Sequence, residues 1–278
     1  MSEDSFYLQC PSNSSMHIFK DNTLASYTVN LDNALELSED FEVGLAELQY
    51  PQSWDNIRRG SNKIKIVYTY GQMGKVDILE KEVPAGYYHS VPELIAVILD
   101  VYKTTRKERI TLDGLEMKFN PTTRRVFIST DKMKLRISRT NGKIHTPKVQ
   151  SAAIELYDDV ARLLGFRNKT IIDTGKTMES EFAATPSGGF HQMYLYTDII
   201  YPQPHPDGNV SILRTIAIEG APNREYLSKR FQKIYYMPLL KRTITTIEFK
   251  IMDDIGKLVG FDYGKVIVIL HFRRKGYK

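Results

Sequence analysis

The apolar stretch at residues 245–274 constrains the fold more than any other part of the chain. Ile247, Phe249 and Ile251 alternate with polar residues, which is typical of a strand with one face in a core and the other in water. Residues 266–272 are then apolar almost without a break. A strand that is apolar on both faces must be covered on both, by a second sheet, a domain or another subunit. The sequence therefore predicts a central strand here, flanked by earlier segments.

The period-two spacing gives this strand two faces. One face carries Val266, Val268, Leu270 and Phe272, and the other carries Ile267, Ile269 and His271. We expect Leu270 and Phe272 to be almost fully buried within the subunit.

Alternating apolar segments occur near both ends of the chain. The early segments are residues 6–10, 26–31 and 41–50, and the late segments are residues 192–200, 210–218 and 231–236. Together with the two terminal strands they number about eight, which is the strand count of a jelly roll. Immunoglobulin-like sandwiches have nearly as many strands, so the count alone does not separate the two folds.

The middle of the chain has a mixed α/β pattern. Two hairpins are predicted, one from residues 63–70 and 76–83 and the other from residues 115–119 and 124–129. Ser90 and Glu93 form a capping-box pattern ahead of apolar residues at helical spacing. A second helix is predicted over residues 153–164, with Gly165 as its C-terminal stop.

This order of patterns predicts a mainly β fold, namely a single jelly-roll β-sandwich with an inserted α/β lobe. The sandwich is expected to be discontinuous and to comprise residues 1–74 and 181–278. Residues 75–180 would form the inserted lobe. Strands from both ends of the chain should then share one core.

The sequence contains no recognisable catalytic or cofactor motif. The glycine motifs GxxxxGK[ST] and GxGxxG are absent, as are GxSxG and HExxH. The histidines lack the spacing of metal ligands. Two adjacent aspartate pairs occur, Asp158-Asp159 on the expected exposed side of a helix and Asp253-Asp254 in a turn. We therefore expect no enzyme activity, no cofactor and no metal site.

The single cysteine, Cys10, excludes an internal disulfide framework and fits a reducing compartment. No apolar run approaches the ~20 residues of a membrane span. The first residues, MSEDSFYL, are acidic where a signal peptide would be basic. These features predict synthesis and assembly inside a cell.

Basic residues cluster in the predicted lobe. One cluster closes the first helix at residues 103–109, and the other comprises Arg124, Arg125, Lys132, Lys134, Arg136 and Arg139. The second cluster is interleaved with Phe119 and Phe127, a combination typical of surfaces that bind single-stranded nucleic acid. The net charge of +5 is mild, however, and a solvated basic face is the alternative interpretation.

Six sequence blocks carry a resemblance to a known family. In order they are PSNSSM with FKDNTLASYTVNL, FEVGLAELQYP, GYYHSVPELIAVI, VARLLGF, LYTDIIYPQ, and the terminal stretch TIEFKIMDDIGKLVGFDYGKVIVILHFRR. Their order and spacing resemble the minor capsid, or penton, protein of Maverick/Polinton elements and the related adintoviruses. The resemblance spans nearly the whole chain.

This resemblance implies a single jelly roll that assembles as a homopentamer at icosahedral five-fold vertices, beside a double-jelly-roll major capsid protein. The protein would then be part of a virion or capsid and would be made in the cytoplasm or nucleus of the host cell. Three classes of function stay open: a structural capsid subunit first, a nucleic-acid-binding module second, and an enzyme with an unrecognised site third.

A closed ring needs a subunit contact, and the chain has surplus aromatic residues near its predicted strand ends. The candidate interface residues are Tyr194, Tyr196, Tyr201, Tyr235, Tyr236 and Met237. Tyrosine and methionine are enriched at the cores of interfaces. For any one of these residues, packing in the core or in a loop is the competing explanation.

Overall fold

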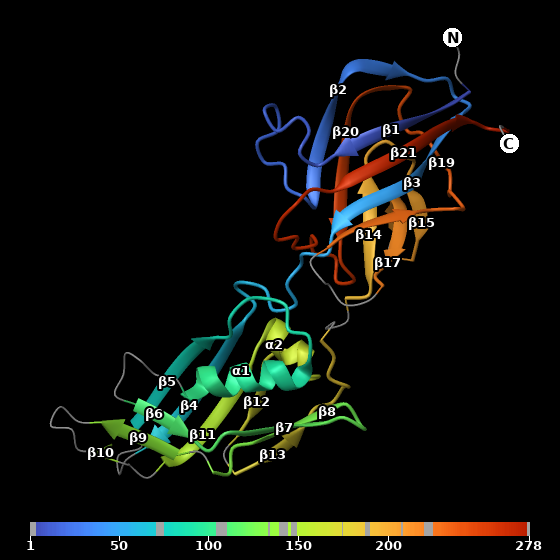
Figure 1. Cartoon of the computed structure of the whole chain (residues 1–278). Coiled ribbons are helices and arrows are strands. Elements are labelled where there is room, and N and C mark those ends of the chain that lie inside the picture. The colour runs from blue at the N-terminus through green and yellow to red at the C-terminus, as the bar shows by residue number, and fades with distance from the viewer. Residues whose placement is uncertain are drawn as a thin grey trace. The chain divides into compact units, whose positions relative to one another are not determined.

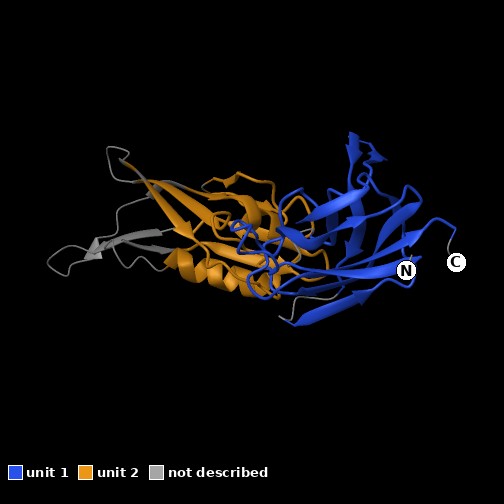
Figure 2. Cartoon of the chain, turned by 90° about the horizontal axis from the view of Figure 1, so that it is seen from above, with its two compact units in different colours: residues 1–54, 190–278 blue, residues 55–189 orange. Residues whose placement is uncertain are grey.

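The computed structural model describes residues 4–276, apart from residues 71–74, 104–109, 133, 139–143, 146–148, 174, 187–189, 207 and 220–224. The chain divides into two compact units. One comprises Met1–Trp54 and Phe190–Lys278, and the other comprises Asp55–Gly189 (Figure 2). Each unit has its own hydrophobic core.

The first unit is a sandwich of two antiparallel sheets. Its first sheet has the strand order β1-β21-β3-β18, with the short β19 also paired to β3 (Figure 1). The bounds are Ser5–Pro11 for β1, Ile267–Arg274 for β21, Phe41–Pro51 for β3, Tyr226–Arg230 for β18 and Met237–Pro238 for β19. The terminal strand β21 therefore lies between β1 and β3, which is the central position that the sequence predicts.

The second sheet of this unit has the strand order β17-β14-β20-β2. The bounds are Ile212–Ala217 for β17, Gln192–Thr197 for β14, Thr243–Met252 for β20 and Ser26–Glu36 for β2. A small two-stranded ribbon, β15 at Gln203–His205 with β16 at Gly208–Val210, lies between β14 and β17 in sequence.

The pairing of these strands follows a nested pattern that defines a jelly roll. The first long strand pairs with the last, β1 with β21, and the second pairs with the next to last, β2 with β20. The same rule pairs β3 with β18 and β14 with β17. The chain therefore forms one long antiparallel ribbon, which the lateral pairs β21–β3 and β20–β14 roll into two sheets. The jelly-roll prediction is confirmed.

The sandwich core is made by the inward faces of both sheets. Leu270 and Phe272 are 0% exposed, as expected. The ring of Phe272 stacks on that of Phe6, with 4.9 Å between centroids. The opposite face of β21, with Ile269 and His271, is only half-buried within the subunit. The sequence predicts that both faces of β21 are covered. In the described chain the inward face is fully buried and the outward face is only partly covered.

Residues 231–236, predicted as a strand, lie between β18 and β19 instead. Gly44 on β3 explains the interruption. A Cβ built on Gly44 would lie 2.4 Å from the Cγ2 of Ile234 and 2.6 Å from the carbonyl oxygen of Tyr235. The connection therefore crosses close over β3 at a point where no side chain blocks it.

The second unit contains three small antiparallel sheets and two helices. The sheet orders are β12-β11-β4-β5, β13-β8-β7 and β10-β9-β6. The bounds are Lys63–Tyr70 for β4, Lys75–Glu82 for β5, Ile110–Asp113 for β6, Glu116–Asn120 for β7, Arg125–Ser129 for β8, Lys134–Ser138 for β9, Ile144–His145 for β10, Val149–Leu156 for β11, Thr170–Ile172 for β12 and Thr177–Glu179 for β13. Both predicted hairpins are present, as β4–β5 and β7–β8.

Helix α1, Val91–Lys103, packs its apolar face into the core of the second unit. Its start follows the predicted capping box, because the hydroxyl of Ser90 accepts a hydrogen bond from the backbone N–H of Glu93 at 3.2 Å. The Glu93 carboxylate in turn accepts from the backbone N–H of His89 at 2.8 Å. None of the helices in the described parts of the chain is long and apolar enough to span a membrane.

The second predicted helix, over residues 153–164, is wrong in its first half. Those residues continue strand β11, which pairs with β4, and helix α2 occupies only Asp158–Leu163. Asp159 is 2% exposed rather than on an exposed face. Its carboxylate accepts hydrogen bonds from Arg58 at 2.9 Å and Arg162 at 2.8 Å. The pKa of Asp159 is below its usual value: burial acts to raise it, but the hydrogen bonds and charge of Arg58 outweigh that effect.

The boundaries predicted at residues 74 and 181 differ from those of the two compact units, which lie after Trp54 and after Gly189. The first difference has a simple cause. A boundary at residue 74 separates β4 from β5, whereas those strands pair along their whole length within one sheet. A local hairpin belongs to one unit, so β4 lies with the lobe.

Truncation of Phe272 tests the central position of β21. Phe272→Ala removes a fully buried ring from the sandwich core, and the expected cost is about 3–5 kcal/mol of unfolding free energy. Urea denaturation followed by near-ultraviolet circular dichroism measures it. Tyr201→Ala, at a residue that is 50% exposed, should change stability by roughly 0.5 kcal/mol or less. Equal effects of the two changes would show that β21 is not central.

Gly44→Ala tests the crossing over β3. The added methyl would meet the backbone of Tyr235 as well as the side chain of Ile234, so the connection has to move. We expect a loss of about 1–3 kcal/mol, the usual cost of overpacking. Gly256→Ser is the comparison for backbone strain without a steric collision. Gly256 has a φ of +73°, and no atom lies within 4 Å of the position of its Cβ. A stable Gly44→Ala variant would contradict the close crossing.

Candidate functional site

The six candidate interface residues lie in three separate places on the first unit. Tyr194 and Tyr196 project from the outer face of β14 and are half-buried. Tyr235, Tyr236 and Met237 lie in or beside the β18–β19 connection, next to the other sheet. Tyr201 follows β14, where its backbone N–H donates to the carbonyl of Pro238 at 3.1 Å. The structure therefore does not bring them together into one surface.

An aromatic cluster on the outer face of the first sheet joins one of these residues to three that were not predicted. We call Tyr7, Tyr236, His271 and Arg273 the tyrosine patch. The ring of Tyr7 stacks on His271 with 4.3 Å between centroids. The hydroxyl of Tyr236 lies 2.7 Å from the Nδ1 of His271, within hydrogen-bond distance. The guanidinium of Arg273 lies 3.5 Å from the ring centroid of Tyr236.

The charges around the tyrosine patch are arranged with cations outward. Arg273 donates to the carboxylate of Glu42 at 2.7 Å, and Arg230 donates to Glu47 at 3.0 Å. The side chain of Glu47 is 11% exposed while that of Arg230 is 82% exposed. Burial, followed by the charge of Arg273, lowers the pKa of His271 below its usual value. The patch thus holds a neutral imidazole at neutral pH and presents guanidinium groups at its rim.

Tyr235 has a mainly structural role in the subunit. Arg214 on β17 lies over two aromatic rings, 4.3 Å from the centroid of Phe231 and 4.0 Å from that of Tyr235. It also donates to the carbonyl of Lys233 at 3.0 Å. These contacts connect the edge of the second sheet to the β18–β19 connection beside the first. One residue at the sandwich edge thereby fixes the connection that crosses Gly44.

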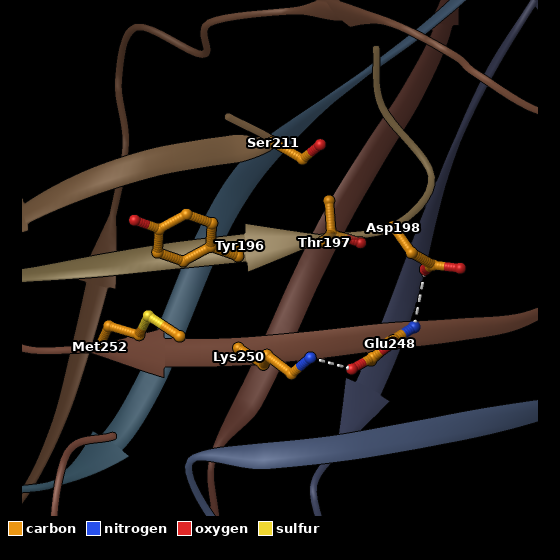
Figure 3. A pocket seen from close by; sticks show the side chains of 7 residues that line it. All are labelled: Tyr196, Thr197, Asp198, Ser211, Glu248, Lys250 and Met252. Atoms are coloured by element: carbon orange, nitrogen blue, oxygen red, sulfur yellow. Dashed lines mark hydrogen bonds and ion pairs between the residues drawn. The ribbon is translucent and has the colours of Figure 1, made fainter. Parts of the chain in front are cut away.

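A hollow on the outer face of the second sheet lies beside Tyr196. We call it the β14 hollow, and it encloses about 220 Å³. Figure 3 shows the residues that line it, which are Tyr196, Thr197, Asp198, Ser211, Glu248, Lys250 and Met252. Tyr196 and Met252 supply apolar surface, and hydroxyl and carboxylate groups supply hydrogen-bond acceptors.

The charged residues of the β14 hollow are already paired. Asp198 accepts from the backbone N–H of Glu248 at 2.8 Å and from the ammonium of Lys241 at 2.6 Å. Glu248 is paired with Lys250 at 2.6 Å. Two carboxylates and two ammonium groups therefore balance, which suits a neutral polar group better than an ion.

Thr197 is the unusual residue of the hollow. It is 4% exposed, and its Oγ1 has no hydrogen-bond partner among the described residues. A register shift between Leu195 and Tyr196 interrupts the pairing of β14 with β17 just before it. Such irregularities re-aim side chains at functional places. Thr197 alternates onto the inward side of β14 with Met193 and Leu195, so the unpartnered hydroxyl is enclosed within the subunit and costs stability.

Tyr201 lines a different hollow of about 320 Å³, at the sandwich end near β19. Its neighbours there include the buried Phe41 and the exposed Leu240. Lys241, Arg242 and Lys275 also line it. This surface combines apolar and basic groups.

The described residues contain no group of three or more histidine, cysteine, aspartate or glutamate side chains placed to hold a metal ion. Cys10 is fully buried. Burial raises the pKa of its thiol to about 12, so it is protonated and unreactive at neutral pH.

The basic lobe is largely paired where it is described. Lys132 binds Glu116 at 2.8 Å, and Arg125 lies 3.8 Å from Glu179. Phe119 packs against the core of the lobe. Residues 104–109 and Arg139 lie outside the described residues, and the side chains of Lys134 and Arg136 do as well.

Sequence reasoning missed Tyr7, His271 and Arg273 as one cluster, and it missed Thr197. Alternation in residues 6–10 places Tyr7 on the outer face, and His271 falls on the outer face of β21. The missing information is the pairing of the first strand with the last, which puts Tyr7 directly opposite His271. No sequence signal marks the unpartnered hydroxyl of Thr197.

No family model matches the sequence, and no curated protein matches it. One solved structure with a similar arrangement is the crystal structure of the selenomethionine-labelled mavirus penton protein. The likeness covers 98% of this chain and 100% of that chain, with a TM-score of 0.44 and 11% sequence identity. These values are too low to support an inference about function, and the jelly-roll assignment rests on the strand pairing above.

The lowered pKa of His271 predicts a pH dependence of stability. The folded protein resists protonation of His271 more than the unfolded chain does, because burial and Arg273 disfavour the imidazolium. Its stabilising contribution is therefore present above an unfolded pKa of about 6.5 and is lost as the pH falls through the folded pKa. Denaturation between about pH 5 and pH 7.5 should show a smaller loss of stability for His271→Phe than for the natural protein.

A proton NMR titration of the His271 ring provides the direct check. The midpoint should lie below about 6.5. A midpoint at or above that value would contradict the buried, cation-adjacent site.

Proposed function

We propose that this protein is a structural capsid subunit, the penton protein of a virus-like shell. The observation that carries the proposal is the nested pairing of β1 with β21 and β2 with β20. It makes the jelly roll, an architecture of viral capsid and lectin domains. The six sequence blocks that resemble the penton proteins of Maverick/Polinton elements and adintoviruses add independent support. Jelly rolls serve several functions, so the fold alone does not identify one. The resemblance of the six sequence blocks favours a capsid function among them.

The proposed assembly is a homopentamer at the five-fold vertices, with a double-jelly-roll major capsid protein as its partner. In a closed ring each subunit uses two different surfaces, one toward each neighbour. The tyrosine patch and the β14 hollow lie on the outer faces of different sheets, so they supply two such surfaces. The half-buried outer face of β21 would then gain cover from a neighbouring subunit. The protein would be located in the virion and be made in the host cell.

The alternative function is nucleic-acid binding by the basic lobe. Two described cations of the cluster are paired with acidic side chains, Lys132 with Glu116 and Arg125 with Glu179, whereas no ion pair among the described residues is present at the exposed Arg124. Pairing of this kind lowers the charge available for phosphate groups. No feature of the described lobe favours this function over the structural one.

Native mass spectrometry of the purified protein at micromolar concentration tests the proposal. A pentamer free of nucleic acid at moderate salt is the expected result. A trimer would indicate a role like that of a major capsid protein, and bound nucleic acid at moderate salt would favour the alternative. If the protein stays a monomer, co-expression with the major capsid protein follows. A monomer in both preparations would contradict the penton function.

A further inference from the structure

The loop between β1 and β2 covers the free edge of β2 with three side chains, those of Ser15, Asn22 and Thr23. We propose that these side chains form a guard that keeps β2 of one subunit from pairing with β2 of a second copy. The three residues are called the edge guard below. This role goes beyond the proposed capsid function and does not depend on whether a ring forms.

Strand β2 is the last strand of the second sheet, so one of its edges has no neighbouring strand in the described chain (Figure 1). An antiparallel strand turns the backbone groups of alternate residues toward its two sides. The backbone N–H groups of Ser26, Thr28 and Asn30 face the free edge, since they bond to the loop and not to β20. Without the loop, this edge would present a row of unpaired N–H and C=O groups, which is a template for another strand.

Two hydroxyl groups of the edge guard cover the ends of this row. The hydroxyl of Thr23 accepts a hydrogen bond from the backbone N–H of Ser26 at 3.0 Å. The hydroxyl of Ser15 accepts from the backbone N–H of Asn30 at 2.9 Å. Ser15 has a φ of 57°, a left-handed conformation that is uncommon for a residue other than glycine. The loop therefore keeps an unusual backbone conformation at the residue that reaches the far end of the row.

Asn22 covers the middle of the row. Its side-chain amide makes two bonds to Thr28, accepting from the backbone N–H and donating to the backbone carbonyl, each at 2.9 Å. A side-chain amide has the same kinds of donor and acceptor as a peptide group. Asn22 thus makes the pair of bonds that one residue of a neighbouring strand would make, and it fills the place of that strand.

The covered segment has the composition of a strand that associates readily. Residues 26–31 read SYTVNL and contain no charged residue, no proline and no glycine. Six-residue segments with strong strand propensity and low charge are an aggregation hazard when they lie on an exposed edge. Proteins commonly protect such an edge with lysine or proline. Residues 26–31 have neither, so their protection depends on the loop.

The other edge strands of the sandwich have protection in their own sequences. Strand β17 contains Arg214, and β18 contains Lys229 and Arg230. Strand β1 ends with Pro11. The edge guard is therefore found at the edge whose own sequence offers the least resistance to pairing.

Hydrogen bonds, more than apolar packing, hold the edge guard on β2. A hollow of about 410 Å³ is lined by residues 18–22 of the loop and residues 26–28 at the start of β2. Met16 and Ile18 of the loop are each 49% exposed, and neither packs against the sandwich core. Removal of the guard side chains should therefore uncover the edge without creating a cavity in that core.

Hydrogen exchange of the backbone amides tests the covered edge in the full-length protein. Asn22→Ala should speed exchange at the Thr28 amide roughly five- to tenfold, because that amide loses its one acceptor. Asn33→Ala, at an exposed asparagine of β2 outside the covered segment, is the matched control and should leave that rate unchanged. An unchanged rate in Asn22→Ala overturns the guard.

A guardless variant, with Ser15→Ala, Asn22→Ala and Thr23→Val together, tests the pairing itself. It should form larger species at concentrations where the natural protein forms none, and analytical ultracentrifugation detects them. In these species the amides of the three edge residues of β2 should be protected again, since they bond to a second chain. Circular dichroism and thermal unfolding establish that the variant is folded. A folded guardless variant that does not associate overturns the inference.

A rescue experiment separates edge pairing from general destabilisation. Thr28→Lys places a charge at the middle of the free edge and should restore the natural sedimentation pattern in the guardless variant. Thr246→Lys is the matched control, because Thr246 lies opposite Asn30 on β20, one strand in from the edge. The same charge there should not prevent association. Failure of Thr28→Lys to prevent it, or equal rescue by Thr246→Lys, contradicts pairing through β2.

The outcomes for the edge guard and for the penton function are distinguishable. The guardless variant is compared with the natural protein in whichever state that protein adopts, so a natural monomer contradicts the penton function and leaves this comparison intact. If the natural protein and the guardless variant are both pentamers of the same size, the penton function stands and the guard is wrong. Larger species of the guardless variant that Thr28→Lys abolishes support the guard in either case.

Discussion

The pairing of β21 with both β1 and β3 is the interaction on which the rest of the first unit depends. It joins the last strand of the chain to the first on one side and to the third on the other. Once β1 and β21 are adjacent, the remaining strands follow as an antiparallel ribbon that rolls into two sheets. Such pairing is remote in sequence, so forming it has a high cost in loop entropy. The fully buried Leu270 and Phe272 offset that cost by removing large apolar surface from water.

Period-two alternation was enough to predict a mainly β fold and the central place of β21, but the number of strands alone did not separate a jelly roll from an immunoglobulin-like sandwich. The alternation was not enough at two points. Ile154 and Leu156 fit both the helical and the strand periods, and only the pairing with β4 decides for a strand. The interruption at residues 231–236 depends on Gly44, which lies far away in sequence. Of the six predicted interface residues, three lie beside the first sheet, two lie on the second, and Tyr201 lies in the loop after β14. Their role at an interface stays a prediction.

Two polar residues of the sandwich differ in whether their side chains have partners within the subunit. Arg214 is engaged with Phe231, Tyr235 and Lys233, so it stabilises the subunit and has little left for a partner. Thr197 is the opposite case, since its buried hydroxyl is unpartnered within the described chain. Natural proteins pair nearly all buried polar groups, so Thr197 is an exception that lowers the stability of the sandwich. This contrast could not be read from the sequence, because both residue types are common in strands and at their edges.

The place of the inserted lobe follows from how the jelly roll is closed. The chain leaves the sandwich at Trp54, after β3, and returns at Phe190, before β14. The indole of Trp54 packs edge-on against Phe190 with 5.4 Å between centroids and also contacts Phe261 at 6.1 Å. Insertions are tolerated where the two crossing points lie close together at the surface of an intact domain. Trp54 meets that condition, because its contacts hold the point where the chain leaves the sandwich next to Phe190, where the chain returns, and next to Phe261 before β21. A large lobe can therefore be added without disturbing the pairing of β1, β21 and β3.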